Sequence, residues 1–119
     1  MTETLSPYIL HMNASIYDAA AKILLNSTRT LIILNDNSKV IGVISEGDLL
    51  RSILNNENPR VAVSDVMNRA FQSCLETTAV NRHQVLNWLK RGILLVPICD
   101  SSGSLVDVVN VMSEANRCL

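Results

Sequence analysis

The segment from Gly42 to Arg51 carries the residues best suited to chemistry in this chain. Its apolar first half predicts a strand and its second half a helix, so Ser45 falls at the strand end and Asp48 in the first helical turn. A helix N-terminus presents free backbone N–H groups and a partial positive charge, which suit a phosphate. A carboxylate one turn further on can accept both hydroxyls of a ribose. The segment fits a nucleotide site, but local physics alone favours a plain helix start capped by Ser45 with Asp48 as a favourable first-turn acid.

No other group of residues points to catalysis. The four glycines form neither a dinucleotide-binding nor a P-loop pattern. His83 has no strained Gly-x-Ser-x-Gly turn to work with, which favours a structural role for it. The three cysteines and two histidines show no metal-ligand spacing. We therefore predict a protein that is not an enzyme and that requires no metal or cofactor.

The composition is typical of a small folded protein with an aliphatic core. The chain has 119 residues, 48% hydrophobic, 3% aromatic and 18% charged, with a net charge of −1. This balance excludes disorder, and the lack of a basic face argues against nucleic acid as a partner. No apolar run reaches the roughly 18–20 residues of a membrane span, and no signal-peptide pattern is present. Cys74, Cys99 and Cys118 are typical of reduced thiols in a cytoplasmic protein.

The elements that must position Ser45 and Asp48 occur twice, at a spacing of 65 residues. Residues 31–45 align with residues 96–110 without a gap, apolar on apolar and turn on turn. Each copy predicts a short strand, a helix, two strands joined by a polar turn, and a second helix. The predicted fold is mixed α/β (α+β). It has two β-α-β-β-α repeats, at residues 1–58 and 59–119, packed sheet to sheet with pseudo-twofold symmetry, because one repeat alone has a marginal core.

Local signals predict where these elements begin and end. Ser15 is the expected N-cap of the first helix, and Thr78 that of its counterpart in the second copy. Trp88 is expected either in the core or facing a partner. A polar, proline-broken linker at 56–60 is followed by a predicted capped helical turn at 64–67. The expected strands are at 9–10, 31–34, 40–44, 72–75, 94–99 and 105–109, and the expected second helices at 47–55 and 111–119.

The two copies resemble a tandem pair of cystathionine-β-synthase (CBS) domains, a Bateman module. The repeat of that family carries hydrophobic-Pro-hydrophobic-hydrophobic-Asp, a short turn, and then Gly-hydrophobic-hydrophobic-Thr/Ser-x-x-Asp. The first copy matches the later part of this signature with Gly42, Ser45 and Asp48. The second copy matches the earlier part with the run from Val96 to Asp100. The similarity extends over nearly the whole chain.

The resemblance implies a regulatory module that binds an adenosine-containing ligand: AMP, ADP, ATP or S-adenosylmethionine. Such a module controls an attached or associated enzyme or transporter, and it commonly forms a homodimer. A finer likeness, in residues 46–51 and 64–68, is to the CBS pairs fused to sugar-phosphate nucleotidyltransferases, which makes such an enzyme an expected partner. The alternative is a dimerisation scaffold whose ligand pockets have decayed.

In that family the ligand lies in a cleft between the repeats, with the Ser/Thr and Asp from one repeat and the adenine clamp from the other. Carried over to this sequence, the ligand-binding residues are Ser45, Gly47, Asp48, Thr77, Thr78, Ile93, Leu94, Leu95 and Pro97. Arg51 and Lys39 are the expected phosphate contacts, with Arg29 and Arg91 as further candidates. Arg51 is equally placed for a surface ion pair with Asp48. Because so few positive charges are available for phosphate groups, we expect AMP or an adenosyl ligand with a sulfonium group rather than ATP.

The second copy departs from the signature at its three polar positions. Where the first copy has Gly42, Ser45 and Asp48, the second has Asp107, Asn110 and Ser113. Because the ribose carboxylate is missing there, we expect one competent cleft and one weak or inactive cleft. The first copy departs as well, with Ile32 in place of proline and Asn35 in place of aspartate. Those two positions shape the strand and its turn.

Overall fold

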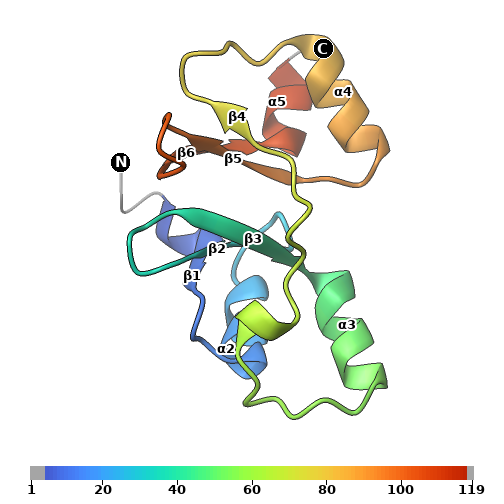
Figure 1. Ribbon diagram of the computed structural model, residues 1–119. Helices are drawn as coiled ribbons and strands as arrows, with labels where there is room; N and C mark the ends of the chain where they lie inside the picture. The colour runs from blue at the N-terminus through green and yellow to red at the C-terminus, as the bar shows by residue number, and fades with distance from the viewer. Residues whose placement is uncertain (1–4, 118–119) are drawn as a thin grey trace.

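The computed structural model describes residues 5–117, which form two copies of one unit (Figure 1). The first unit comprises β1 (Ile9–His11), α2 (Ile16–Ile23), β2 (Thr30–Leu34), β3 (Val40–Ser45) and α3 (Glu46–Leu54). The second comprises β4 (Cys74–Leu75), α4 (Arg82–Lys90), β5 (Leu95–Cys99), β6 (Leu105–Asn110) and α5 (Val111–Arg117). Two 3-10 turns, η1 (Ser6–Tyr8) and η2 (Val63–Asp65), complete the chain. The predicted β-α-β-β-α order is confirmed in both units; the predicted helix end at 118–119, with Cys118, lies outside the described residues.

The two sheets repeat each other in register. Each central strand, β2 or β5, pairs in parallel with the first strand of its unit and antiparallel with the third. Thr30 pairs with Ser45, and 65 residues further on Leu95 pairs with Asn110. Both hairpins are interrupted at the same place, just after Ile33 in one and just after residue 98 in the other. Since even this irregularity recurs, the 65-residue repeat is confirmed for the hairpins.

Each unit has its own aliphatic core between its sheet and its helices. In β2, Leu31 and Ile33 belong to the first core, so alternation along the strand turns Ile32 to the opposite face of the sheet. Ile32 and its counterpart Pro97 are fully buried although neither belongs to a core. The two sheets face each other in the middle of the molecule, where β2 contacts β5, and the four α-helices lie outside them (Figure 1). This is the predicted sheet-to-sheet packing.

The hairpin turns of the two units also bond to each other. Val40 N donates to Gly103 O at 3.1 Å, and Leu105 N donates to Ser38 O at 3.2 Å. The ammonium group of Lys39 donates to a backbone carbonyl of the other turn at 2.6 Å. The reciprocal pattern matches the pseudo-twofold relation of the two repeats.

The chain between α3 and β4, residues 55–73 and called the linker from here on, returns to the first unit before it crosses to the second. Met67 is buried in the first core, and Val43 and Asn68 exchange backbone hydrogen bonds of 3.0 and 2.7 Å. A Cβ on Gly42 would lie 2.5 Å from the sulfur of Met67, so glycine is required where the two segments cross. The predicted capped turn is the 3-10 turn η2, which has no side-chain cap. The division of the repeats at residue 58 stays a prediction.

Helix α4 begins later than predicted. Its N-cap is Asn81, whose Oδ1 accepts from Gln84 N at 2.9 Å. Thr78, the predicted cap, instead closes a turn by donating its N–H to Leu75 O at 3.0 Å. That prediction was wrong because the connection from strand to helix is longer in the second unit, residues 76–81 against residues 12–15. The 65-residue offset from Ser15 would give Val80, and the observed cap, Asn81, lies one residue beyond it.

The structure confirms the predicted N-cap at Ser15 and decides between the two positions expected for Trp88. Ser15 is the N-cap of α2, with its hydroxyl accepting from Asp18 N at 3.1 Å. Trp88 is 4% exposed and belongs to the second core, not to a surface that faces a partner.

Candidate ligand-binding site

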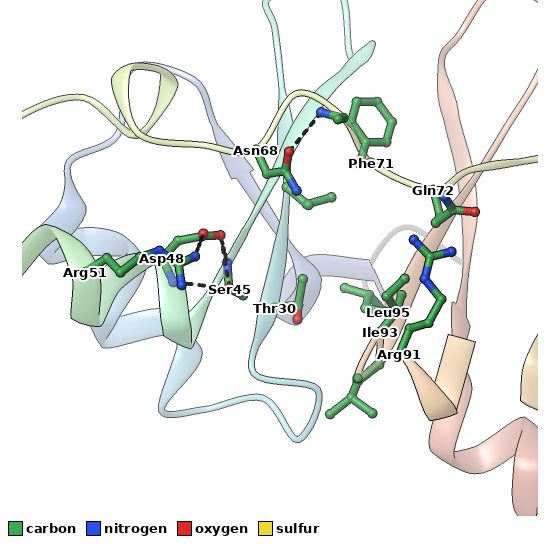
Figure 2. A pocket seen from close by; sticks show the side chains of 14 residues that line it. Thr30, Ser45, Asp48, Arg51, Asn68, Phe71, Gln72, Arg91, Ile93 and Leu95 are labelled. Atoms are coloured by element: carbon green, nitrogen blue, oxygen red, sulfur yellow. Dashed lines mark hydrogen bonds and ion pairs between the residues drawn. The ribbon is translucent and has the colours of Figure 1, made fainter. Parts of the chain in front are cut away.

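A cavity of about 340 Å³ opens between the two units, beside the start of α3 (Figure 2). Its volume lies at the small end of the range for small-molecule sites. The wall combines the first unit, the linker and the second unit. Its residues are Thr30, Val43, Ser45, Asp48, Arg51, Asn68, Ala70, Phe71, Gln72, Arg91, Gly92, Ile93, Leu94 and Leu95.

The polar edge of the cavity is a capping box at the start of α3. Asp48 N donates to Ser45 Oγ at 3.2 Å, and Ser45 N donates back to Asp48 Oδ2 at 2.8 Å. The Ser45 hydroxyl donates to the same Oδ2 at 3.0 Å, and the guanidinium of Arg51 donates to Oδ1. The predicted cap is thus confirmed. The same two side chains lie on the cavity wall, so capping and ligand binding do not exclude each other.

The apolar wall comes from the segment between α4 and β5 and from the first residue of β5. Gly92, with φ of +76°, turns the chain out of α4 in the left-handed conformation that favours glycine. Ile93, Leu94 and Leu95 follow and line the cavity opposite the capping box (Figure 2). Ile93 N is held by Trp88 O at 2.8 Å. This wall offers the apolar contact that a flat, polar-edged ring requires.

The linker supplies a third wall that the sequence did not predict. Asn68 turns the chain by accepting from Ala70 N at 2.9 Å (Figure 2). Phe71 and Gln72 then line the cavity, and Gln72 Oε1 accepts from the indole N–H of Trp88 at 3.4 Å. One signal was available, because Phe71 is the single phenylalanine of the chain.

The structure brings together part of the predicted site. The predicted residues on the cavity wall are Ser45, Asp48, Arg51, Ile93, Leu94 and Leu95. Thr77 and Thr78 are instead exposed in the turn after β4, because β4 begins at Cys74 and residues 68–72 are the ones that pass the cavity. Pro97 is buried between the sheets, and Lys39 bonds to the opposite hairpin turn. Gly47 lies in the first turn of α3, next to the wall but outside its lining.

The charged side chains on the cavity wall sum to one positive charge. They are Asp48, Arg51 and Arg91. Arg51 is paired with Asp48, whereas Arg91 takes part in none of the ion pairs found within residues 5–117. Figure 2 shows its guanidinium turned toward Gln72. Arg29 pairs with Glu46 at 3.3 Å and lies outside the wall. The cavity therefore favours an anion over a cation.

The counterpart cavity in the second repeat is smaller, about 170 Å³. Asn110 lies at its edge and accepts from Ser113 N at 3.2 Å, in the manner of Ser45 and Asp48. Its described wall holds Ser27, Thr28, Leu94, Asn110, Met112, Ser113 and Asn116, with neither a carboxylate nor a cation among them. The prediction of one competent and one weak cleft stays a prediction.

Other reactive groups lie away from the cavity. Burial raises the pKa of the Cys74 and Cys99 thiols, and for Cys99 the neighbouring Asp100 adds to the effect. Neither cysteine forms a disulfide. Across residues 5–117 no three His, Cys, Asp or Glu side chains are grouped to hold a metal ion. The helices of that part of the chain are too short or too polar to cross a bilayer.

The family model of the CBS domain matches residues 1–55. Residues 1–55 are a CBS domain. The transcriptional repressor CcpN of Bacillus subtilis (strain 168) is 38% identical over 64 residues, which cover 53% of this chain and 30% of the repressor. This chain thus spans under a third of the length of that curated relative.

Solved structures extend the CBS likeness to both repeats. The CBS domain pair of protein MJ0100, in complex with 5′-methylthioadenosine and S-adenosyl-L-methionine, matches with a TM-score of 0.77 at 23% identity, over 95% of this chain and 92% of that one. The CBS domain protein PAE2072 from Pyrobaculum aerophilum, complexed with AMP, matches with a TM-score of 0.72 at 19% identity, over 93% and 92%. The two repeats together therefore have the fold of a CBS domain pair.

Proposed function

We propose that this CBS domain pair is a regulatory module that binds an adenosine-containing ligand, namely AMP, ADP, ATP or S-adenosylmethionine. One observation carries the proposal: the Ser45–Asp48 edge of one repeat and the Ile93–Leu95 wall of the other line a single cavity. The carboxylate of Asp48 would accept the ribose hydroxyls, and the apolar wall would hold the adenine. The relatives solved with AMP and with S-adenosyl-L-methionine support this class of ligand.

The proposed module acts by binding and performs no reaction of its own. A ligand in the cavity would contact both repeats and the linker, so its binding energy would favour one relative position of the two. The altered position of the repeats would control an attached or associated enzyme or transporter in the cytoplasm. A sugar-phosphate nucleotidyltransferase is one such partner. Homodimer formation belongs to the same proposal. It is supported by apolar side chains on the outward face of α3, where Ile53 and Leu54 are 63% and 79% exposed.

Thermal unfolding with and without each of the four ligands tests the proposal. A ligand at 100 times its Kd stabilises by about 2.7 kcal/mol, which raises the Tm of a domain of this size by several degrees. Asp48→Asn should abolish that rise because it removes the charged acceptor of the ribose hydroxyls. Asp18→Asn is the matched control: Asp18 closes the same capping box on Ser15, at 3.0 Å, outside the cavity.

The outcomes separate the proposal from its alternatives. Equal loss of the ligand response in the Asp48 and Asp18 variants would mean that both act through stability alone. Ser113→Ala should keep the response, and its loss there would assign binding to the smaller cleft. A protein that is dimeric by sedimentation and responds to none of the four ligands would be the dimerisation scaffold.

A further inference from the structure

Most of the hydrogen-bond acceptor positions of the Asp48 carboxylate, which the proposed ligand requires, are already occupied. Oδ2 of Asp48 accepts from both the N–H and the hydroxyl of Ser45, and Oδ1 accepts from Arg51. An ionised carboxylate has about four lone-pair positions. Three are in use, and a ribose diol that donates two hydrogen bonds needs two. One existing partner must therefore leave before a ribose can bind.

Arg51 is the partner that can leave. Of the two bonds from Ser45, the one from its N–H closes the capping box of α3 and the one from its hydroxyl is partly buried, whereas the bond from Arg51 is exposed. The Arg51 side chain is 69% exposed, whereas that of Asp48 is 15% exposed. Exposed pairs three residues apart on a helix are weak, so the guanidinium exchanges readily with water or with another anion.

The released guanidinium has an anion site within reach. Arg51 lies on the cavity wall, and its Nη1 is 3.6 Å from the point where a Cβ of Gly47 would be, at the first turn of α3. A phosphate attached to a ribose held by Asp48 would meet this helix N-terminus. Arginine binds phosphate through charge-assisted, often bidentate hydrogen bonds, which are stronger than a surface ion pair. Arg91 on the opposite wall adds a second cation.

We propose that Arg51 selects the ligand of this cavity: it competes with uncharged nucleosides for Asp48 and yields that position only to a ligand whose phosphate takes the guanidinium in exchange. The preferred ligand is then a nucleoside monophosphate, in line with the small volume of the cavity. S-adenosylmethionine carries a sulfonium cation where the exchange requires an anion, so it binds more weakly. This inference rests on the proposed function.

Titration calorimetry of the whole chain with AMP, adenosine and S-adenosylmethionine tests it. The unaltered protein should bind AMP at least about tenfold more tightly than the other two. In Arg51→Gln, AMP binding should weaken about five- to tenfold, while adenosine binding stays unchanged or tightens about twofold as its competitor is removed. Arg117→Gln is the matched control. Arg117 forms an ion pair at 3.1 Å with Glu114, also three residues away on its helix, and neither residue lines the cavity. It should change neither affinity.

The results that would overturn the inference differ from those that would overturn the proposed function. If Arg51→Gln weakens AMP and adenosine equally, or changes neither, Arg51 does not select the ligand. If the unaltered protein binds adenosine or S-adenosylmethionine as tightly as AMP, the inference fails and the binding function stands. If none of the three ligands binds, the proposed function fails and the inference with it.

Discussion

Ser45 and Ser15 begin their helices in the same way, but only Ser45 lies on the cavity wall. Each hydroxyl accepts from the backbone N–H three residues later, at 3.2 Å for Ser45 and 3.1 Å for Ser15. A cap and a proposed ligand contact are thus combined in one side chain. The chain itself contains a second copy of the cap without the cavity, which allows the two roles to be measured separately.

Ser45→Ala and Ser15→Ala should each lower the free energy of unfolding by about 1 kcal/mol, because each removes an N-cap. Only Ser45→Ala should also reduce the stabilisation by AMP. Urea unfolding with and without AMP measures both quantities. An equal AMP effect in the two variants would leave Ser45 as a cap alone.

The sequence predicts the cavity residues Ser45 and Asp48 but not Phe71 and Gln72, for a physical reason. Ser45 and Asp48 stand three residues apart at a strand-to-helix junction, so local geometry alone brings them together. Phe71 and Gln72 reach the cavity only because Met67 is buried in the first core and Gln72 bonds to Trp88. Those contacts join segments far apart in the sequence, and a local pattern does not report them.

Strand β3 and the linker constrain each other at the scale of elements. The linker lies against β3, with Asn68 paired to Val43 and Met67 inserted beside Gly42. In the second repeat Asp107 stands at the position of Gly42, and its strand β6 has no such bridge to a crossing segment among the described residues. The glycine of the first copy therefore answers a packing requirement that the second copy lacks.

Gly42→Ala should destabilise the protein by about 1–3 kcal/mol, because its Cβ would overlap Met67 and crowd Asn68 O at 3.1 Å. Gly47→Ala is the comparison: its Cβ would meet its nearest neighbours at 3.6 and 3.7 Å, an ordinary contact, and alanine favours a helix. Urea unfolding of both variants distinguishes them. Full stability of Gly42→Ala would mean that the linker does not pack as described.

Element prediction succeeded where the two copies have equal lengths. The hairpins align at 65 residues because their strands, turns and bulges are the same size. The start of α4 was misplaced because the preceding connection is longer, and Thr78 consequently lies in a turn. Insertions in an exposed connection cost little free energy, so a repeat does not keep them constant.

The two hairpin turns hold the halves of the molecule together and are built alike. Asp100 Oδ1 accepts from Ser102 N at 2.9 Å and from Ser104 N at 3.0 Å. Asn35 Oδ1 accepts from the corresponding N–H groups at 2.9 and 3.0 Å. The Ser102 hydroxyl, the backbone bonds and the nearby Lys39 lower the pKa of Asp100. The same turn thus exists once with a charge and once with a neutral amide.

Asp100→Asn should fold normally, since Asn35 already supports this turn, and it should alter the pH dependence of stability. Because the pKa of Asp100 is lower in the folded protein than in the unfolded one, its ionised carboxylate stabilises the fold at pH values above the unfolded pKa of about 3.9. That stabilisation is lost as the pH falls through the folded pKa. Urea unfolding at about pH 7 and at steps below about pH 4 should show the advantage of the unaltered protein over the variant shrinking. A constant difference throughout would exclude a role for the charge.

The arrangement of the whole molecule was only partly contained in the sequence pattern. The repeat predicted two like halves and, from the marginal core of one copy, their sheet-to-sheet packing. That a cavity would lie between the halves came from the family resemblance, since no local pattern predicts where two units meet. The unequal volumes, about 340 and 170 Å³, follow from side chains that differ between the copies and from the linker, which lines only the larger one.

The chain crosses from one repeat to the other once, and Phe71 and Gln72 lie on that crossing at the cavity wall. This crossing is the covalent connection between the two repeats. Under the proposed function, a small molecule bound against Phe71 would contact that connection directly as well as both repeats. Occupancy of the cavity would then be felt first as restricted rotation between the halves, and any protein joined to both helical faces would sense it as a change in their relative angle.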